Sequence, residues 1–127
     1  MPIITPDIKH FTWAELVCSC CQRVRVDDRL FDHMRRLEAL RGWWDGPLRI
    51  TSGYRCAEHN VVIGGAPQSQ HLHFATDIQA VGTNEQRRDA VDTLADKAEA
   101  LGFDGIGRYP TFVHLDLRGA AARWNRR

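Results

Sequence analysis

The stretch SQHLHFATDIQ, residues 69–79, places His71, His73 and Asp77 within seven residues. A second polar pair, His114 and Asp116, is separated by a single leucine. Imidazole nitrogens and carboxylate oxygens are zinc ligands in proteins, and two nitrogens, one carboxylate and an open fourth position are typical of catalytic zinc. Such an ion lowers the pKa of a bound water and polarises a carbonyl group. The residue types are therefore compatible with a hydrolytic zinc site.

The same residues also fit a simpler interpretation, a polar edge on a buried strand. The chain contains six histidines, and some of them will lie near carboxylates by chance. Placement favours the metal hypothesis, because Asp77 and His114 fall in predicted strands whose alternate residues are largely apolar. A histidine or an aspartate inside a strand is costly to bury unless it is paired or binds a metal.

The elements that must position these residues can be predicted from periodicity and capping signals. Apolar residues at spacings of three and four predict an amphipathic helix over residues 28–41. Alternation predicts a strand from Phe74 and a hairpin of residues 105–109 with 112–118. The remaining expected elements are a short helix from Thr12, a strand at 48–51, a short helix at 57–62 and a long helix at 83–101. Because helices and strands do not alternate regularly, we expect an α+β fold: a small, mostly antiparallel sheet with N-terminal helices and one long helix packed on it.

Length and composition limit the class of protein. With 127 residues, we expect a single domain spanning residues 1–127. No apolar run approaches the roughly 18 residues that cross a bilayer, so we expect no membrane partner. The net charge is +1 and the only basic cluster is Arg123, Arg126 and Arg127, which argues against a nucleic-acid partner. The first residues lack a basic segment followed by an apolar one, so we expect synthesis in the cytoplasm.

Four cysteines occur at positions 18, 20, 21 and 56. A structural zinc site is one interpretation, but four-thiolate sites usually use pairs spaced C-x2-C or wider. The neighbouring thiols of Cys20 and Cys21 are also poorly suited to chelate together. We therefore favour buried or free thiols in a reducing compartment, while a metal or disulfide role stays open.

Six short motifs resemble those of one peptidase family, and they occur in order along the chain. They are SGYR at 52–55, EHN at 58–60, GGAPQSQH at 64–71, ATDI at 75–78, GFDGIGRYP at 102–110 and FVHLDLRG at 112–119. Over roughly residues 10–124, from FTWAEL to the closing ARW, the chain is similar to the D-alanyl-D-alanine carboxypeptidase family of zinc peptidases. That family shares its site with D-Ala-D-Ala dipeptidases, phage L-alanyl-D-glutamate endolysins and the hedgehog signalling domain.

The resemblance implies a fold like that of hedgehog and the D-Ala-D-Ala peptidases, with Zn²⁺ bound by His71, Asp77 and His114. It implies that Arg55 polarises the substrate carbonyl or holds a carboxylate, a task suited to a planar fork of donors. A structural ion pair is the other interpretation of this arginine. Ser69 is expected to orient the loop before the first ligand, in the substrate-binding region. The implied reaction is zinc-dependent hydrolysis of a peptide bond in peptidoglycan stem peptides or cross-links, by a carboxypeptidase or an endopeptidase.

Two departures from the family pattern affect the predicted site. Relatives have six residues between the first histidine and the aspartate, with a glycine among them; here five residues separate His71 from Asp77, and the glycine is missing. Either the loop is shortened with the same ligands, or His73 takes part. Several relatives have an acid three residues before the last histidine, where this chain has Thr111. Asp116 is then the nearest acid by sequence, and it is either the general base or a partner that fixes the tautomer of the last ligand.

The resemblance also implies a setting, cell-wall lysis by a phage-encoded enzyme that acts after release or as part of a virion. We expect a monomer or a component of a phage particle. The chief alternative is a non-catalytic structural or binding module of a phage particle that retains the peptidase fold. The short spacing between the first two ligands and the presence of Thr111 favour that alternative.

Overall fold

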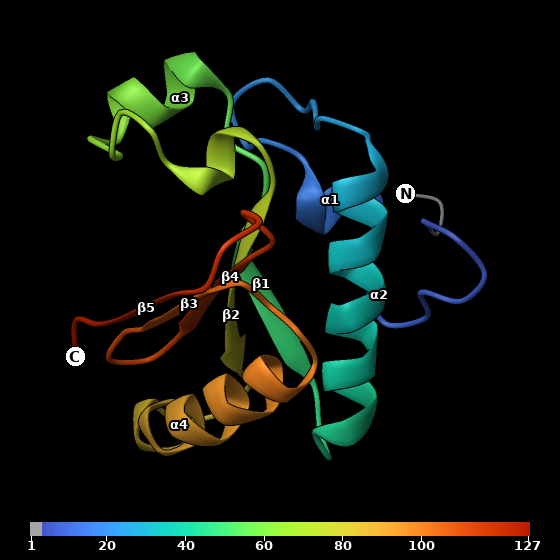
Figure 1. Ribbon diagram of the computed structural model, residues 1–127, viewed down its shortest axis with the longest axis vertical. Coiled ribbons are helices and arrows are strands. Elements are labelled where there is room, and N and C mark those ends of the chain that lie inside the picture. The colour runs from blue at the N-terminus through green and yellow to red at the C-terminus, as the bar shows by residue number, and fades with distance from the viewer. Residues whose placement is uncertain (1–3) are drawn as a thin grey trace.

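The computed structural model describes residues 4–127, which contain four α-helices, one 3-10 turn and five strands (Figure 1). The first three residues of the predicted domain 1–127 lie outside the described residues. In chain order the elements are α1 Trp13–Leu16, α2 Asp28–Trp43, β1 Leu48–Ser52, α3 Ala57–Val62, the 3-10 turn η1 Gln70–Leu72, β2 Ala75–Ala80, α4 Asn84–Ala100, β3 Gly105–Arg108, β4 Val113–Asp116 and β5 Ala122–Asn125. Two of these, η1 and β5, were not expected from the sequence.

The two long helices begin at side-chain caps that the sequence encodes. Asp27 accepts a hydrogen bond from the backbone N–H of Leu30 at 3.0 Å, which satisfies an unpaired donor at the start of α2. Thr83 and Gln86 form a reciprocal capping box at the start of α4. Gly102, with a left-handed φ of 87°, follows the end of α4. Both helices lie within two residues of their predicted bounds.

The five strands form one sheet in the order β1-β2-β4-β3-β5. Three of the four neighbouring pairs are antiparallel, and only β3 and β5 run parallel. The structure thus confirms the predicted α+β class and the mostly antiparallel sheet. The predicted hairpin is also confirmed, since β3 pairs with β4, while β5 adds an edge strand that was not predicted.

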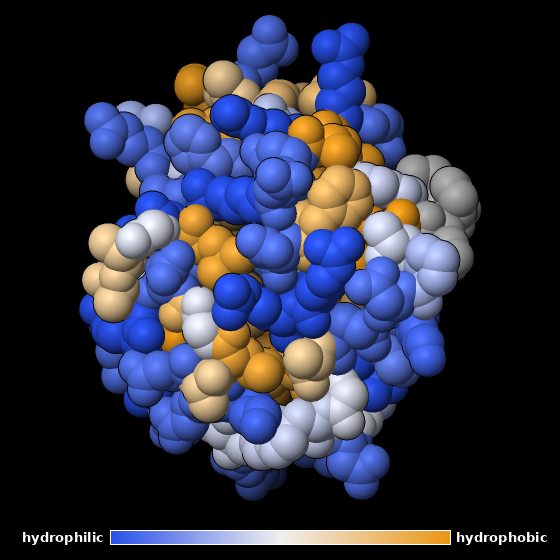
Figure 2. Space-filling view, turned by 45° about the vertical axis from the view of Figure 1, so that its right-hand side comes forward, coloured by the Kyte–Doolittle hydropathy of each residue, from blue (hydrophilic) through white to orange (hydrophobic). Residues whose placement is uncertain are grey.

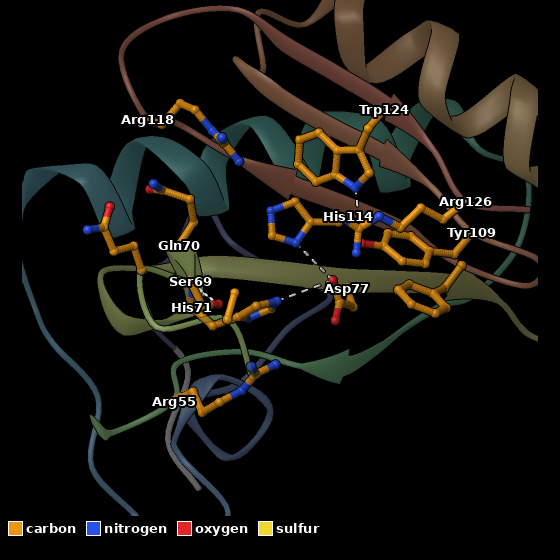
Figure 3. Close-up of a pocket in the computed structure, with 13 residues that line it drawn as sticks. Arg55, Ser69, Gln70, His71, Asp77, Tyr109, His114, Arg118, Trp124 and Arg126 are labelled. Carbon is orange, nitrogen blue, oxygen red and sulfur yellow. Dashed lines mark hydrogen bonds and ion pairs between the residues drawn. The ribbon is translucent and has the colours of Figure 1, made fainter. Parts of the chain in front are cut away.

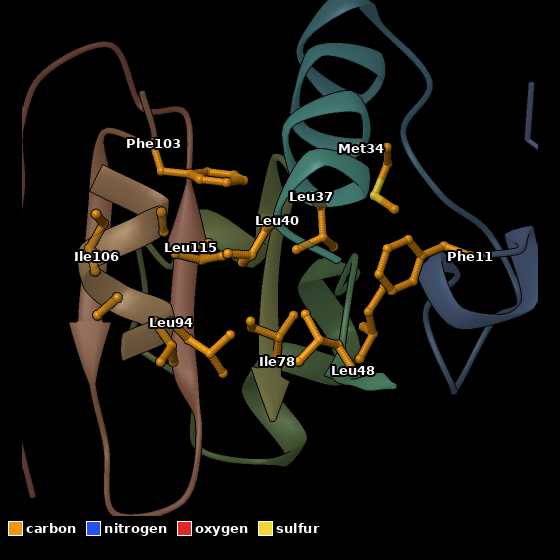
Figure 4. Close-up of a cluster of buried hydrophobic side chains, with 14 of the residues drawn as sticks. Phe11, Met34, Leu37, Leu40, Leu48, Ile78, Leu94, Phe103, Ile106 and Leu115 are labelled. Carbon is orange, nitrogen blue, oxygen red and sulfur yellow. The ribbon is translucent and has the colours of Figure 1, made fainter. Parts of the chain in front are cut away.

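The hydrophobic core lies between one face of the sheet and the long helices. Figure 4 shows Ile78 and Leu115 from the sheet pointing toward Leu40 of α2 and Leu94 of α4. Residues alternate across a strand, so the apolar residues of β4 enter this core while His114 leaves the opposite face. A slip of one residue would exchange the two faces, so the core fixes which residues reach the polar face.

The outer surface carries mostly polar side chains in the view of Figure 2, with apolar residues in small groups between them. Within residues 4–127, no helix has the length and apolar character needed to cross a membrane.

Candidate metal centre

His71, Asp77 and His114 converge on the polar face of the sheet (Figure 3). Asp77 in β2 and His114 in β4 are direct partners in the antiparallel register, so their side chains leave the same face. His71 comes from η1. The atoms His71 Nε2 and His114 Nδ1 lie 3.3 Å and 3.1 Å from the same oxygen, Asp77 Oδ1. The structure therefore brings together the three predicted ligands, with candidate ligand atoms within 4.8 Å of one another.

In each imidazole, the nitrogen that points away from Asp77 has a hydrogen-bond partner. This contact leaves the other nitrogen facing the centre. His71 Nδ1 lies 2.7 Å from the carbonyl oxygen of Gly53, which can only accept, so this nitrogen donates. His114 Nε2 lies 2.7 Å from Asp116 Oδ2 and donates to that carboxylate. Zinc-binding histidines usually donate their second nitrogen to a carbonyl or carboxylate in this way. The donor set and its orientation therefore fit a zinc ion.

Asp116 is fully buried, and both of its oxygens are occupied. Oδ2 accepts from His114 Nε2 and from Arg118 Nη2, each at 2.7 Å. Oδ1 accepts from Arg118 Nε at 2.9 Å and from the Arg118 backbone N–H at 3.1 Å. Burial raises the pKa of Asp116, but the hydrogen bonds from His114 and Arg118 outweigh it and hold the pKa below its ordinary value. Asp116 is thus an ionised acceptor behind His114 rather than a residue that lines the cleft.

The charge of the centre follows from the same contacts. Burial raises the pKa of Asp77, but hydrogen bonds from His114 and His71 dominate and lower the pKa to about 2. Burial lowers the pKa of His114, but Asp116 and Asp77 outweigh it and raise the pKa above its ordinary value. Both carboxylates are therefore ionised near neutral pH, which favours a cation between the ligands.

The shortened loop before Asp77 still delivers the first ligand. Ser69 Oγ accepts from the backbone N–H of His71 at 3.2 Å and caps η1. Phe74 then inserts into the core, so the chain between the two ligands is anchored at both ends. His73 is exposed and lies outside the group of candidate ligands. Of the two interpretations of the spacing, the structure agrees with a shorter loop that keeps the same ligands.

Arg55 lies on the wall of the same cleft, next to the first ligand. Its backbone N–H donates to the carbonyl oxygen of His71 at 2.9 Å. Its Nη1 donates to Asn60 Oδ1 at 2.9 Å, and the buried Asn60 is held in turn by the carbonyl of Ala66, also at 2.9 Å. This partner is a neutral amide, so the contact does not neutralise the positive charge of the guanidinium.

Two glycines in β3 make room for side chains around His114. Gly105 and Gly107 face Asp116 and His114 across the β3–β4 pair. A Cβ at Gly105 would overlap the Asp116 carboxylate, and a Cβ at Gly107 would overlap the indole ring of Trp124. The Trp124 ring lies 5.1 Å from the His114 ring between centroids. Alternating glycines in a strand indicate a close approach of this kind, and this signal could have revealed the tryptophan.

The centre opens into a cleft of about 550 Å³. One part of its wall is aromatic: Tyr109 and Phe112 stack at 4.4 Å, and Trp124 Nε1 donates to Tyr109 Oη at 3.0 Å. The lining also includes the guanidiniums of Arg55 and of two further arginines. The residues that line the cleft are Arg55, Ala66, Gln68, Ser69, Gln70, His71, Asp77, Tyr109, Phe112, His114, Arg118, Trp124 and Arg126. All predicted site residues except Asp116 are among them, and the aromatic wall was not predicted.

Asp77 and His114 of the sheet and His71 of η1 thus give a cleft the two histidines and one carboxylate that are typical of a catalytic zinc site in hydrolases. A family model described as Peptidase M15 matches residues 9–116, which is most of the 127-residue chain. The chain therefore belongs to the M15 peptidases, zinc-dependent enzymes of the D-Ala-D-Ala carboxypeptidase type that act on peptidoglycan. A search of curated proteins found no match. The match confirms the family that the motifs indicated.

Proposed function

We propose that this protein hydrolyses a peptide bond in peptidoglycan stem peptides or cross-links and requires Zn²⁺ held by His71, Asp77 and His114. The observation that carries the proposal is the convergence of three ligand atoms on one point of the cleft, with both imidazoles oriented from behind. A zinc ion bound there supplies a Lewis acid that polarises a peptide carbonyl and activates water.

In this proposal Arg55 binds the substrate beside the metal centre. One of its donors is held by Asn60, which orients the planar guanidinium and leaves further N–H groups for a substrate oxygen. A fork of donors stabilises negative charge that develops on a carbonyl oxygen, or it holds a terminal carboxylate. Ser69 acts on the loop: its hydroxyl accepts from the backbone of His71 and so positions the first ligand at the cleft wall.

Asp116 acts as a positioning residue. Its two oxygens are occupied by His114 and Arg118, and it has no exposed surface, so it does not reach a substrate. It keeps the proton on His114 Nε2 and thereby leaves Nδ1 free to bind the metal. Of the two roles that the sequence left open for Asp116, the contacts favour this one.

The cleft lining agrees with a peptide that carries free carboxylates, as stem peptides do. Arg55 and Arg126 place positive charge along the cleft, and the stacked rings of Tyr109 and Phe112 provide a flat apolar wall for a peptide backbone. The setting that the resemblance to endolysins supports is phage-encoded lysis of the cell wall, by a monomer or by a component of a phage particle.

The test compares wild type, His114→Ala and His73→Ala. His73 is the matched control, because it is a histidine from the same segment that is exposed and outside the centre. Zinc content is measured after dialysis, and each protein is incubated with purified peptidoglycan before the released fragments are identified by mass spectrometry. We expect His114→Ala to lose about one zinc ion per chain and all fragment release, while His73→Ala keeps both. Zinc content that His114→Ala leaves unchanged would refute the proposed centre.

A non-catalytic binding module is the second candidate function, and one observation favours it. Among the described residues that line the cleft, Asp77 is the sole carboxylate, and it belongs to the ligand set. Thr111 lies in the loop between β3 and β4, at the position where several relatives have an acid. Zinc binding without fragment release from several types of cell wall would support this candidate over the peptidase.

A further inference from the structure

The four cysteines form a second cluster that the proposed reaction does not use. Cys18, Cys20 and Cys21 come from one turn near the N-terminus, and Cys56 precedes α3. All four Sγ atoms lie within 4.8 Å of one another, and none is in a disulfide. Adjacent thiols such as those of Cys20 and Cys21 are poorly suited to chelate together in an extended chain, but the backbone turn brings both sulfurs within 4.8 Å of the other two.

The turn itself is tightly closed. The backbone N–H of Cys18 donates to the carbonyl of Arg23 at 2.7 Å, and the N–H of Gln22 donates to the carbonyl of Cys18 at 2.8 Å. Gln22 has a φ of 59°, the one positive φ of a non-glycine residue in residues 4–127. This left-handed conformation is unfavourable for glutamine, so the loop geometry is imposed by the contacts around it.

The spacing of the sulfurs matches a metal rather than a covalent bond. Cys56 Sγ lies 3.6 Å from Cys18 Sγ and 3.3 Å from Cys20 Sγ. Disulfide sulfurs are about 2.05 Å apart, whereas four sulfurs placed tetrahedrally at about 2.3 Å from zinc are about 3.8 Å apart. Backbone N–H groups also point at two of the sulfurs, from Cys56 to Cys18 at 3.5 Å and from His59 to Cys56 at 3.4 Å. Such donors stabilise thiolates, the form that binds metal.

We propose that Cys18, Cys20, Cys21 and Cys56 bind a second, structural Zn²⁺ ion. Four thiolates with no open position make a closed site, which stabilises a fold and does not activate water. The ion would tie the N-terminal turn to the segment that follows Arg55. The residue before Arg55 is already joined to the N-terminal region, because the Tyr54 N–H donates to the Leu16 carbonyl at 2.8 Å. The structural ion would therefore help to hold Arg55 at the cleft wall.

The experiment measures metal binding by the cysteines in a variant that lacks the proposed catalytic site. Zinc is measured by mass spectrometry in wild type, His114→Ala, Cys56→Ser and Ser19→Ala, the last being a control within the same turn. We expect about two zinc ions per chain in wild type and Ser19→Ala, and about one in each of the other two. Cobalt replacing zinc in His114→Ala should give intense sulfur-to-cobalt charge-transfer absorption.

The result that overturns the proposal is a His114→Ala protein that binds no metal. Its four thiols would then react with a thiol reagent in the folded state, or intact mass would show a disulfide. This readout needs no cysteine variant, so poor folding of Cys56→Ser does not affect it. The two proposals can be refuted separately. The zinc that His114→Ala loses tests the catalytic centre, and the zinc that this variant keeps tests the cysteine site.

Discussion

Replacing Asp116 by asparagine separates the two roles that this carboxylate could have. The side chain keeps its size, but the negative charge behind His114 is lost and Arg118 loses its ion pair. Removing the partner of a metal-binding histidine typically weakens metal affinity 10–100-fold, which corresponds to about 1.4–2.7 kcal/mol. Because Asp116 is fully buried and accepts four hydrogen bonds from these two residues, we expect an effect toward the upper end of that range.

Zinc affinity of Asp116→Asn is measured by competition with a chromogenic chelator, beside the rate of peptidoglycan cleavage at saturating zinc. Asp96→Asn is the matched control, because Asp96 also pairs with an arginine, Arg108, but is exposed. We expect weaker zinc binding in Asp116→Asn, with cleavage partly restored by excess zinc, and no change in the control. Unchanged zinc affinity together with complete loss of cleavage would refute the positioning role and identify Asp116 as the base.

Three further predictions concern residues around the centre. Gly105→Ala should destabilise the fold by about 1–3 kcal/mol in urea unfolding, because its Cβ would overlap the Asp116 carboxylate, whereas Gly42→Ala, which meets no atom within 4 Å, should not. Burial lowers the pKa of His33 to about 3, below its ordinary 6.5, so the unfolded chain binds the extra proton and stability falls as the pH drops below 6.5. Measured by urea unfolding, the free energy of unfolding should fall by about 2 kcal/mol between pH 7 and pH 5 because of His33, and His33→Gln should lack this decrease. Arg55→Lys should lower kcat/KM about 10²-fold with unchanged zinc content, since a lysine cannot present the same fork; unaltered kinetics would exclude Arg55 from the reaction.

The helices could be predicted because their signals are local, whereas the ligand set His71, Asp77 and His114 was implied by the resemblance of short motifs to the peptidase family. Each cap, Asp27 or Thr83, directly precedes the helix that it begins, and the apolar stripe of α2 repeats every three or four residues. The alternation around Asp77 and His114 likewise shows which strand face carries them. Their direct pairing could not be read in this way, because it depends on the register between β2 and β4, segments about 37 residues apart.

The missed features depend on contacts between distant segments. β5 has only four residues and alternates half-buried with exposed positions, so its composition does not mark a core strand. It forms because the carbonyl of Asp104 accepts from the N–H of Ala122 at 2.9 Å and the chain continues beside β3. Trp124 reaches His114 only through this parallel pairing, across the space left by Gly107.

The cysteine turn shows why a spacing rule applied to sequence does not determine how close the sulfurs lie. The rule assumes that neighbouring side chains diverge, as they do in a strand or helix. A left-handed residue at Gln22 and two backbone hydrogen bonds instead fold residues 18–23 back on themselves, so adjacent thiols can converge. Cys56 then completes the cluster one residue after Arg55. The segment that carries the proposed substrate-binding arginine is thus held from the cysteine cluster on one side and from His71, through its carbonyl, on the other.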